Sequence, residues 1–96
     1  SVTRDDLDDA GAGQFARTIT EVSKRSPGTN IEILIPDFNA DYDKIITVIK
    51  ANPQVISHNV ETVCRLYPLA RPQSDYQRSL TVLRIIRELA PECVVK

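Results

Sequence analysis

The sequence has few of the residues that would indicate a metal site, a disulfide framework or a membrane segment. Its 96 residues include only two cysteines, Cys64 and Cys93, and one histidine, His58. Because the cysteines fit no CxxC or other metal-ligand spacing, they are expected to be buried, reduced thiols. No apolar run approaches the roughly 20 residues of a membrane span, and no secretory signal is recognisable. We therefore expect a cytoplasmic protein without a membrane partner.

Excess charge is also lacking. The formal net charge is −1, which argues against a general nucleic-acid-binding protein. Acidic residues dominate the first half of the chain and basic residues the second, and most of these charges are interpreted as solvated helix faces. The 42% hydrophobic and 26% charged residues are typical of a soluble globular domain. The length allows one domain with a modest core.

Short β-branched segments alternate with segments of helical periodicity. Strands are expected at 30–35, 54–57 and 93–95, and the first is apolar enough to be covered on both faces. The helices between them are predicted from their caps, namely Asp8 or Asp9, Asn39 or Asp41, Asn59, and Ser74 with Gln77. Residues 68–73 are expected to be irregular. The predicted apolar stripes are Phe15, Ile19 and Val22; Tyr42, Ile45, Ile46 and Ile49; Val60, Val63, Cys64 and Tyr67; and Tyr76, Leu80, Leu83 and Ile86.

This alternation predicts an α/β fold of right-handed, parallel βα repeats. A (β/α) barrel or partial barrel is the first architecture to expect, and an open doubly wound sheet is the second. Residues 1–7 resemble the polar turn that follows a strand, and the sequence ends within a predicted strand. We interpret it as a segment of a longer chain, whose open sheet edges would favour self-association.

Polar side chains gather where the predicted strands end, which is the edge where parallel α/β folds bind ligands. Asn59 and Glu61 place an amide beside a carboxylate there, an arrangement able to hydrogen-bond vicinal ribose hydroxyls. Alternatively, Asn59 caps a helix and Glu61 occupies its first turn. His58 is a candidate base or ligand, although a lone histidine favours a hydrogen-bonded structural role.

Arginines form a second group near this edge. A guanidinium can bind a carboxylate or a phosphate, and Arg71 is held in the irregular segment, whereas Arg65 and Arg78 lie in predicted helices. The alternative is an ion pair with Glu61 or Asp75. A third polar group either lines the same edge or caps the first helix: Thr3, Arg4, Asp5 and Asp6.

Six motifs follow one another along nearly the whole chain. They are Ser-Val-Thr-Arg-Asp-Asp-Leu at 1–7, Ile-Pro-Asp-Phe at 35–38, His-Asn-Val-Glu-Thr-Val at 58–63, Arg-Leu-Tyr at 65–67, Arg-Pro at 71–72 and Asp-Tyr-Gln-Arg-Ser-Leu at 75–80. In order and spacing they resemble the middle of lipoyl synthase, a radical S-adenosylmethionine enzyme. The resemblance implies a partial (β/α) barrel with its active site at the C-terminal ends of the strands.

The resemblance also implies a sulfurtransferase activity. Such an enzyme inserts two sulfur atoms into an octanoyl chain carried by a lysine of a lipoyl carrier protein. One 4Fe-4S cluster cleaves S-adenosylmethionine to a 5′-deoxyadenosyl radical, which abstracts hydrogen, and an auxiliary 4Fe-4S cluster supplies the sulfur.

Residue roles follow from the same resemblance, and none of them is catalytic. Asn59 and Glu61 would hold the ribose of S-adenosylmethionine, and Arg71 would hold its carboxylate. Three residues would lie near the cofactor or octanoyl channel: Arg65, Tyr67 and Tyr76. Four would line the edge after the preceding barrel strand: Thr3, Arg4, Asp5 and Asp6. The chain departs from the family at Ala10-Gly11, where two glycines are usual, and at Ser57, where an asparagine is common.

The cluster-binding cysteine motifs of the family, CxxxCxxC and CxxxxCxxxxxC, are absent from this sequence. Neither Cys64 nor Cys93 matches a cluster ligand, so we expect no metal ligand here. Residues 1–96 are therefore predicted to be one segment of the catalytic barrel that is inactive alone. The alternative is a non-catalytic α/β module that pairs with another chain.

Overall fold

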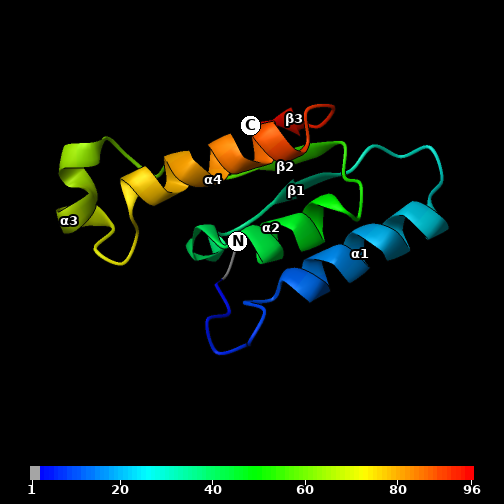
Figure 1. The fold of residues 1–96 in the computed structure, drawn as a ribbon, viewed down its shortest axis with the longest axis horizontal. Helices are drawn as coiled ribbons and strands as arrows, with labels where there is room; N and C mark the ends of the chain where they lie inside the picture. Colours follow the sequence, from blue (N-terminus) through cyan, green and yellow to red (C-terminus); the bar gives the residue numbers. More distant parts are fainter. Residues whose placement is uncertain (1–2) are drawn as a thin grey trace.

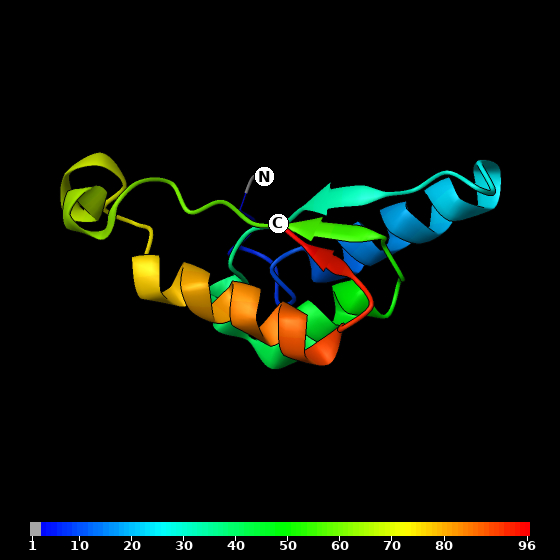
Figure 2. The same cartoon turned by 90° about the horizontal axis from the view of Figure 1, so that it is seen from above.

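The computed structural model describes residues 3–96, and Ser1 and Val2 of the first motif lie outside this range. It shows a small parallel sheet with helices packed on one face (Figures 1 and 2). In chain order the elements are α1 (Ala12–Arg25), β1 (Glu32–Leu34), η1 (Phe38–Ala40), α2 (Tyr42–Ile49), β2 (Val55–Ser57), η2 (Cys64–Leu66), α3 (Tyr67–Ala70), α4 (Tyr76–Leu89) and β3 (Val94–Val95).

The strands lie in the order β1-β2-β3, and both pairs are parallel. Leu34 is paired with Ser57, and Ile56 is paired with Val95. Helix α2 connects β1 to β2, and α4 lies on the connection from β2 to β3. The prediction of parallel βα repeats is therefore confirmed.

The hydrophobic core lies between the sheet and helices α1, α2 and α4, which cover the same face (Figure 2). Its largest fully buried side chains are Phe38, Ile19, Ile35, Ile45, Ile56, Ile85, Ile86, Val48 and Val82. Successive side chains of a strand point to opposite faces. Ile33 of β1 packs against the core, whereas Glu32 and Leu34 are exposed. The prediction that 30–35 is covered on both faces is wrong, because the described helices cover only one.

A polar contact crosses the open face of the sheet. The Glu32 carboxylate accepts hydrogen bonds from the Ser57 hydroxyl at 2.7 Å and from the Lys96 ammonium at 3.3 Å. The hydrogen bond from the Ser57 hydroxyl, followed by that from Lys96, holds the pKa of Glu32 below its usual value. Ser57 therefore joins β1 to β2 through a side chain.

The predicted cap is confirmed for α2, whereas the N-cap residue of α1 is Gly11 and not Asp8 or Asp9. Asp41 is the N-cap of α2, and its carboxylate accepts the backbone N–H of Asp43 at 2.9 Å, as predicted. The Asp9 carboxylate accepts the N–H groups of Gly11 and Gly13, each at 2.9 Å, and these bonds lower the Asp9 pKa. Ala10 and Gly11 have φ values of 52° and 87°. This left-handed backbone explains why two glycines suit these positions.

The predicted cap of α4 is wrong by one residue. Asp75 is the N-cap, and its carboxylate accepts the backbone N–H of Arg78 at 2.9 Å. Ser74 lies one position too early to reach that amide in the helix's first turn. The buried face of α4 shares only Ile86 with the predicted stripe, and consists of Ser79, Val82, Ile85 and Ile86.

The helix predicted to begin directly after Asn59 does not form. Residues 58–63 leave the sheet without helical structure, and Val60 and Val63 of the predicted stripe are exposed. Pro68 lies in the first turn of α3. Proline has no N–H to lose at that position, so it begins this helix instead of ending an earlier one. The segment predicted to be irregular is therefore helical in its first part.

Both cysteines are free thiols. Cys64 is exposed, so its predicted burial is wrong, because the helix expected to cover it does not form. Cys93 is half-buried, and burial raises its pKa.

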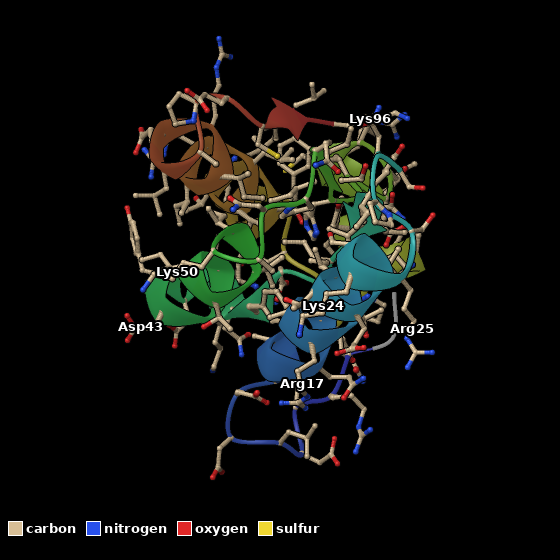
Figure 3. The ribbon with its side chains drawn as sticks, turned by 90° about the vertical axis from the view of Figure 1, so that its right-hand side faces the viewer. Arg17, Lys24, Arg25, Asp43, Lys50 and Lys96 are labelled. Carbon is tan, nitrogen blue, oxygen red and sulfur yellow. The ribbon has the colours of Figure 1, made fainter. Side chains whose placement is uncertain are left out.

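The charged residues of α1 and α2 lie mostly on solvent-facing surfaces, as expected. Arg17, Lys24 and Arg25 of α1, Asp43 of α2, and Lys50 directly after α2 are labelled in Figure 3, and all five are exposed. Within residues 3–96, no helix is long and apolar enough to cross a membrane.

Candidate functional site

A cavity of about 230 Å³ lies beyond the carboxyl ends of β1 and β2, the edge toward which the strand arrows point in Figure 2. Loops after both strands and the start of α4 contribute its walls. Among the residues that line the cavity are the polar residues Thr3, Asp5, Asp37, His58, Asn59, Glu61, Arg71 and Arg78. The three residues predicted to bind S-adenosylmethionine are therefore neighbours in the fold.

Asn59 and Glu61 lie in the loop after β2 with hydrogen-bonding capacity to spare. The Asn59 side chain forms no hydrogen bond with any residue of the described range 3–96, and it caps no helix there. The backbone N–H of Glu61 donates to the Tyr67 hydroxyl at 2.9 Å. Since neither residue begins a helix, the helical alternatives for both are removed.

Arg71 forms an ion pair with Glu61, with 3.2 Å between Nη1 and Oε1. This contact was one of the two alternatives left open for Arg71. The pair uses one of the two carboxylate oxygens and one of five guanidinium N–H donors. The Arg71 side chain is 52% exposed and that of Glu61 is 29% exposed. Both groups can therefore meet a ligand while they remain paired.

A second ion pair also lines the cavity, and the sequence did not predict it. The Nε of Arg78 donates to Oδ2 of Asp37 at 2.8 Å, and both side chains are partly buried. The other oxygen of Asp37 accepts the backbone N–H of Asn39 at 2.9 Å. The available signal was an aspartate directly after a predicted strand, within the motif at 35–38.

Asp37 is followed by an unusual turn. Phe38, Asn39 and Ala40 have φ values of 47°, 55° and 56°, a left-handed conformation that favours glycine. The Phe38 ring is buried and packs edge-to-face on Phe15, with 5.9 Å between centroids. Packing of this ring therefore anchors the turn that carries Asn39 to the cavity wall.

His58 has the structural role that its isolation predicted. One ring nitrogen, Nδ1, lies 2.9 Å from the carbonyl oxygen of Ile35, and the other, Nε2, lies 2.9 Å from the Ser79 hydroxyl. Both nitrogens are thus occupied within the protein.

The group at 3–6 is divided between two places. Thr3 and Asp5 line the cavity, whereas Arg4 lines a separate groove with Leu7 and Phe15. Arg4 donates to Asp6 at 2.8 and 2.9 Å. These hydrogen bonds lower the pKa of Asp6 and raise that of Arg4. Capping of α1, the alternative for this group, does not occur, because the N-cap residue of α1 is Gly11.

The remaining predicted residues do not reach the cavity. Arg65 is exposed on η2. Tyr67 is buried and packs edge-to-face on Tyr76, with 5.7 Å between ring centroids. Tyr67 contacts the site only through its hydroxyl, which accepts the Glu61 N–H.

Comparison with known proteins gives a consistent result. No protein-family model matches the chain. Lipoyl synthase of Caldanaerobacter subterraneus subsp. tengcongensis is 53% identical over all 96 residues, which cover 34% of that protein. Lipoyl synthase of Rubrobacter xylanophilus is 52% identical over 96 residues, or 30% of its length. That of Caldicellulosiruptor saccharolyticus is 53% identical over 89 residues, which are 93% of this chain and 31% of the relative. The chain therefore corresponds to a segment of lipoyl synthase and spans about a third of the length of these relatives.

Proposed function

We propose that the chain supplies part of the S-adenosylmethionine site of a lipoyl synthase. Asn59 and Glu61 bind the ribose hydroxyls, and Arg71 binds the methionine carboxylate. The complete enzyme inserts sulfur into octanoyl chains on lipoyl carrier proteins, in the cytoplasm. S-adenosylmethionine, when bound, supplies the radical chemistry of that reaction.

The proposal is supported most directly by the position of Asn59, Glu61 and Arg71 around one cavity, because each of them suits a chemical group of the ligand. A carboxylate accepts hydrogen bonds from hydroxyl groups, and an amide both donates and accepts them. Glu61 and Asn59 therefore suit a vicinal diol, which carries two donors and several acceptor lone pairs. A guanidinium fork matches a carboxylate in two parallel hydrogen bonds. Arg71 keeps enough free donors for this after its contact with Glu61.

The size of the cavity indicates how much of the ligand these residues hold. Complete small-molecule sites usually enclose about 300–1,000 Å³. At about 230 Å³, this cavity is too small for a whole nucleoside with its amino-acid tail. The described residues are therefore expected to hold the ribose and carboxylate, while other parts of the enzyme surround the rest of the molecule.

Iron–sulfur clusters do not fit the residues described. A 4Fe-4S cluster is held by several cysteine thiolates. Cys64 lies on η2 beyond the cavity, and Cys93 precedes β3 at the opposite end of the strands. No group of histidine, cysteine, aspartate or glutamate side chains in residues 3–96 could hold a metal ion. The two clusters of the enzyme would have to be bound elsewhere in it.

Binding of S-adenosylmethionine by full-length lipoyl synthase that contains this segment tests the proposal. Asn59→Ala, Glu61→Ala and Arg71→Ala are each expected to weaken binding about tenfold, because each removes hydrogen bonds to a polar or charged ligand group. Isothermal titration calorimetry measures the change. Arg84→Ala is the matched control, since Arg84 is an exposed arginine of α4 away from the cavity. Native affinity in all three site variants would contradict the proposal.

A further inference from the structure

We infer that His58 is a positioning residue that holds Asn59 and Glu61 at the ligand cavity. The inference rests on the proposed function, because it concerns how the same site is held. His58 positions the loop that carries these residues and does not itself contact the ligand. Its role depends on three hydrogen bonds and on its place in the chain.

The three hydrogen bonds of His58 join four elements of the fold. Its backbone N–H donates to the carbonyl oxygen of Lys96 at 3.0 Å, directly after β3. Its Nδ1 meets the carbonyl oxygen of Ile35 at 2.9 Å, directly after β1, and its Nε2 meets Ser79 of α4 at 2.9 Å. His58 itself follows β2. The residue therefore links the ends of all three strands to the first turns of α4.

The chemistry of these partners determines where the protons lie. A carbonyl oxygen can only accept, so Nδ1 of His58 carries a proton and donates to Ile35. In the neutral ring, Nε2 then accepts the hydroxyl proton of Ser79. Ser79 is buried, with 4% of its surface exposed, so loss of either partner would leave a polar group without a hydrogen bond inside the protein. The ring is thus locked in both position and tautomer.

The positions of Asn59 and Glu61 depend on the hydrogen bonds of His58. Asn59 follows His58 immediately, and its side chain makes no hydrogen bond within the described part of the chain. The next fixed point is Glu61, whose N–H donates to the buried Tyr67 hydroxyl at 2.9 Å. The loop that carries both proposed ribose ligands is therefore held at one end by His58 and at the other by Tyr67.

Two measurements on full-length lipoyl synthase containing this segment test the inference: the Kd for S-adenosylmethionine, and hydrogen exchange of residues 59–61 without ligand. His58→Ala is expected to weaken binding about tenfold and to speed exchange of the loop. His58→Asn should restore most of both, because its amide N–H can replace Nδ1–H as donor to Ile35. Ser79→Ala should act in the same direction as His58→Ala, with a smaller effect.

Thr81→Ala is the matched control in α4. Its hydroxyl donates within the helix, to the Gln77 carbonyl at 2.9 Å, so its removal should change neither measurement. The inference is overturned if His58→Ala leaves exchange at the native rate, whatever its Kd, since the residue would then not hold the loop. If His58→Ala does not fold, Ser79→Ala decides: faster exchange supports the inference, and native exchange overturns it. Failure of the proposed function looks different, because Asn59→Ala would then bind S-adenosylmethionine like the native enzyme while His58→Ala still loosened the loop.

Discussion

Phe38→Ala is expected to lower the free energy of unfolding by about 3–5 kcal/mol. Phe38 is among the largest fully buried side chains, with 2% of its surface exposed. Its ring packs edge-to-face on Phe15, and aromatic pairs of this kind contribute beyond the area that they bury. Truncation removes these contacts and leaves a cavity beside η1.

Removal of the ring is also expected to change the conformation of the turn. The left-handed conformation costs a non-glycine residue about 1–2 kcal/mol, and three consecutive residues from Phe38 to Ala40 adopt it. Burial of the ring offsets this cost, so the turn loses its anchor when the ring is removed. Asp37 and Asn39 of the cavity wall would shift as a result.

Urea unfolding followed by circular dichroism measures the Phe38→Ala effect. Leu69→Ala is the control, because Leu69 is 85% exposed and its replacement should change stability by no more than about 0.5 kcal/mol. A loss below about 1 kcal/mol for Phe38→Ala would show that the ring is not packed as described.

Asp37→Ala is expected to lower the free energy of unfolding by about 1.5–3 kcal/mol, the range for a hydrogen bond to a charged group. It removes the partner of the partly buried Arg78 guanidinium and the acceptor of the Asn39 N–H. The Asp37–Arg78 pair also joins the loop after β1 to the first turn of α4. Its loss should therefore loosen the cavity wall as well as the fold.

A double variant separates the stability contributed by the ion pair from the cost of leaving the Arg78 charge unpaired. Adding Arg78→Met to Asp37→Ala should recover part of the lost stability, because no unpaired charge then remains. Glu21→Ala serves as the control, since Glu21 makes only exposed contacts with Lys24 and Arg25, and should cost at most about 1 kcal/mol. An Asp37→Ala loss no greater than that of Glu21→Ala would contradict the importance of the partly buried pair.

The parallel βα fold was predictable because its signals are local. The β-branched strands and the Asp41 cap each follow from a few neighbouring residues. The loop at 58–63 was predicted wrongly because Pro68 suits a helix start as well as a helix end, and only the packed structure distinguishes the two.

The candidate site could likewise be predicted only in part. Asn59 and Glu61 could be grouped because both directly follow one predicted strand, and the family resemblance assigned roles to them and to Arg71. The Asp37–Arg78 and His58–Ser79 contacts join residues 41 and 21 positions apart, so they depend on how α4 packs. No spacing rule relates such residues in a single sequence.

We propose that Asn59 and Glu61 bind the ribose hydroxyls of S-adenosylmethionine. An analogue of S-adenosylmethionine that lacks the 2′-hydroxyl tests this claim. The Kd of each compound is measured for native full-length enzyme and for the Asn59→Ala/Glu61→Ala variant. Because a site built to hydrogen-bond a hydroxyl discriminates against a ligand without it, native enzyme should bind the analogue at least about tenfold more weakly. The double variant should bind the two compounds about equally. If the double variant kept the native discrimination, other residues would recognise the ribose and the claim would be wrong.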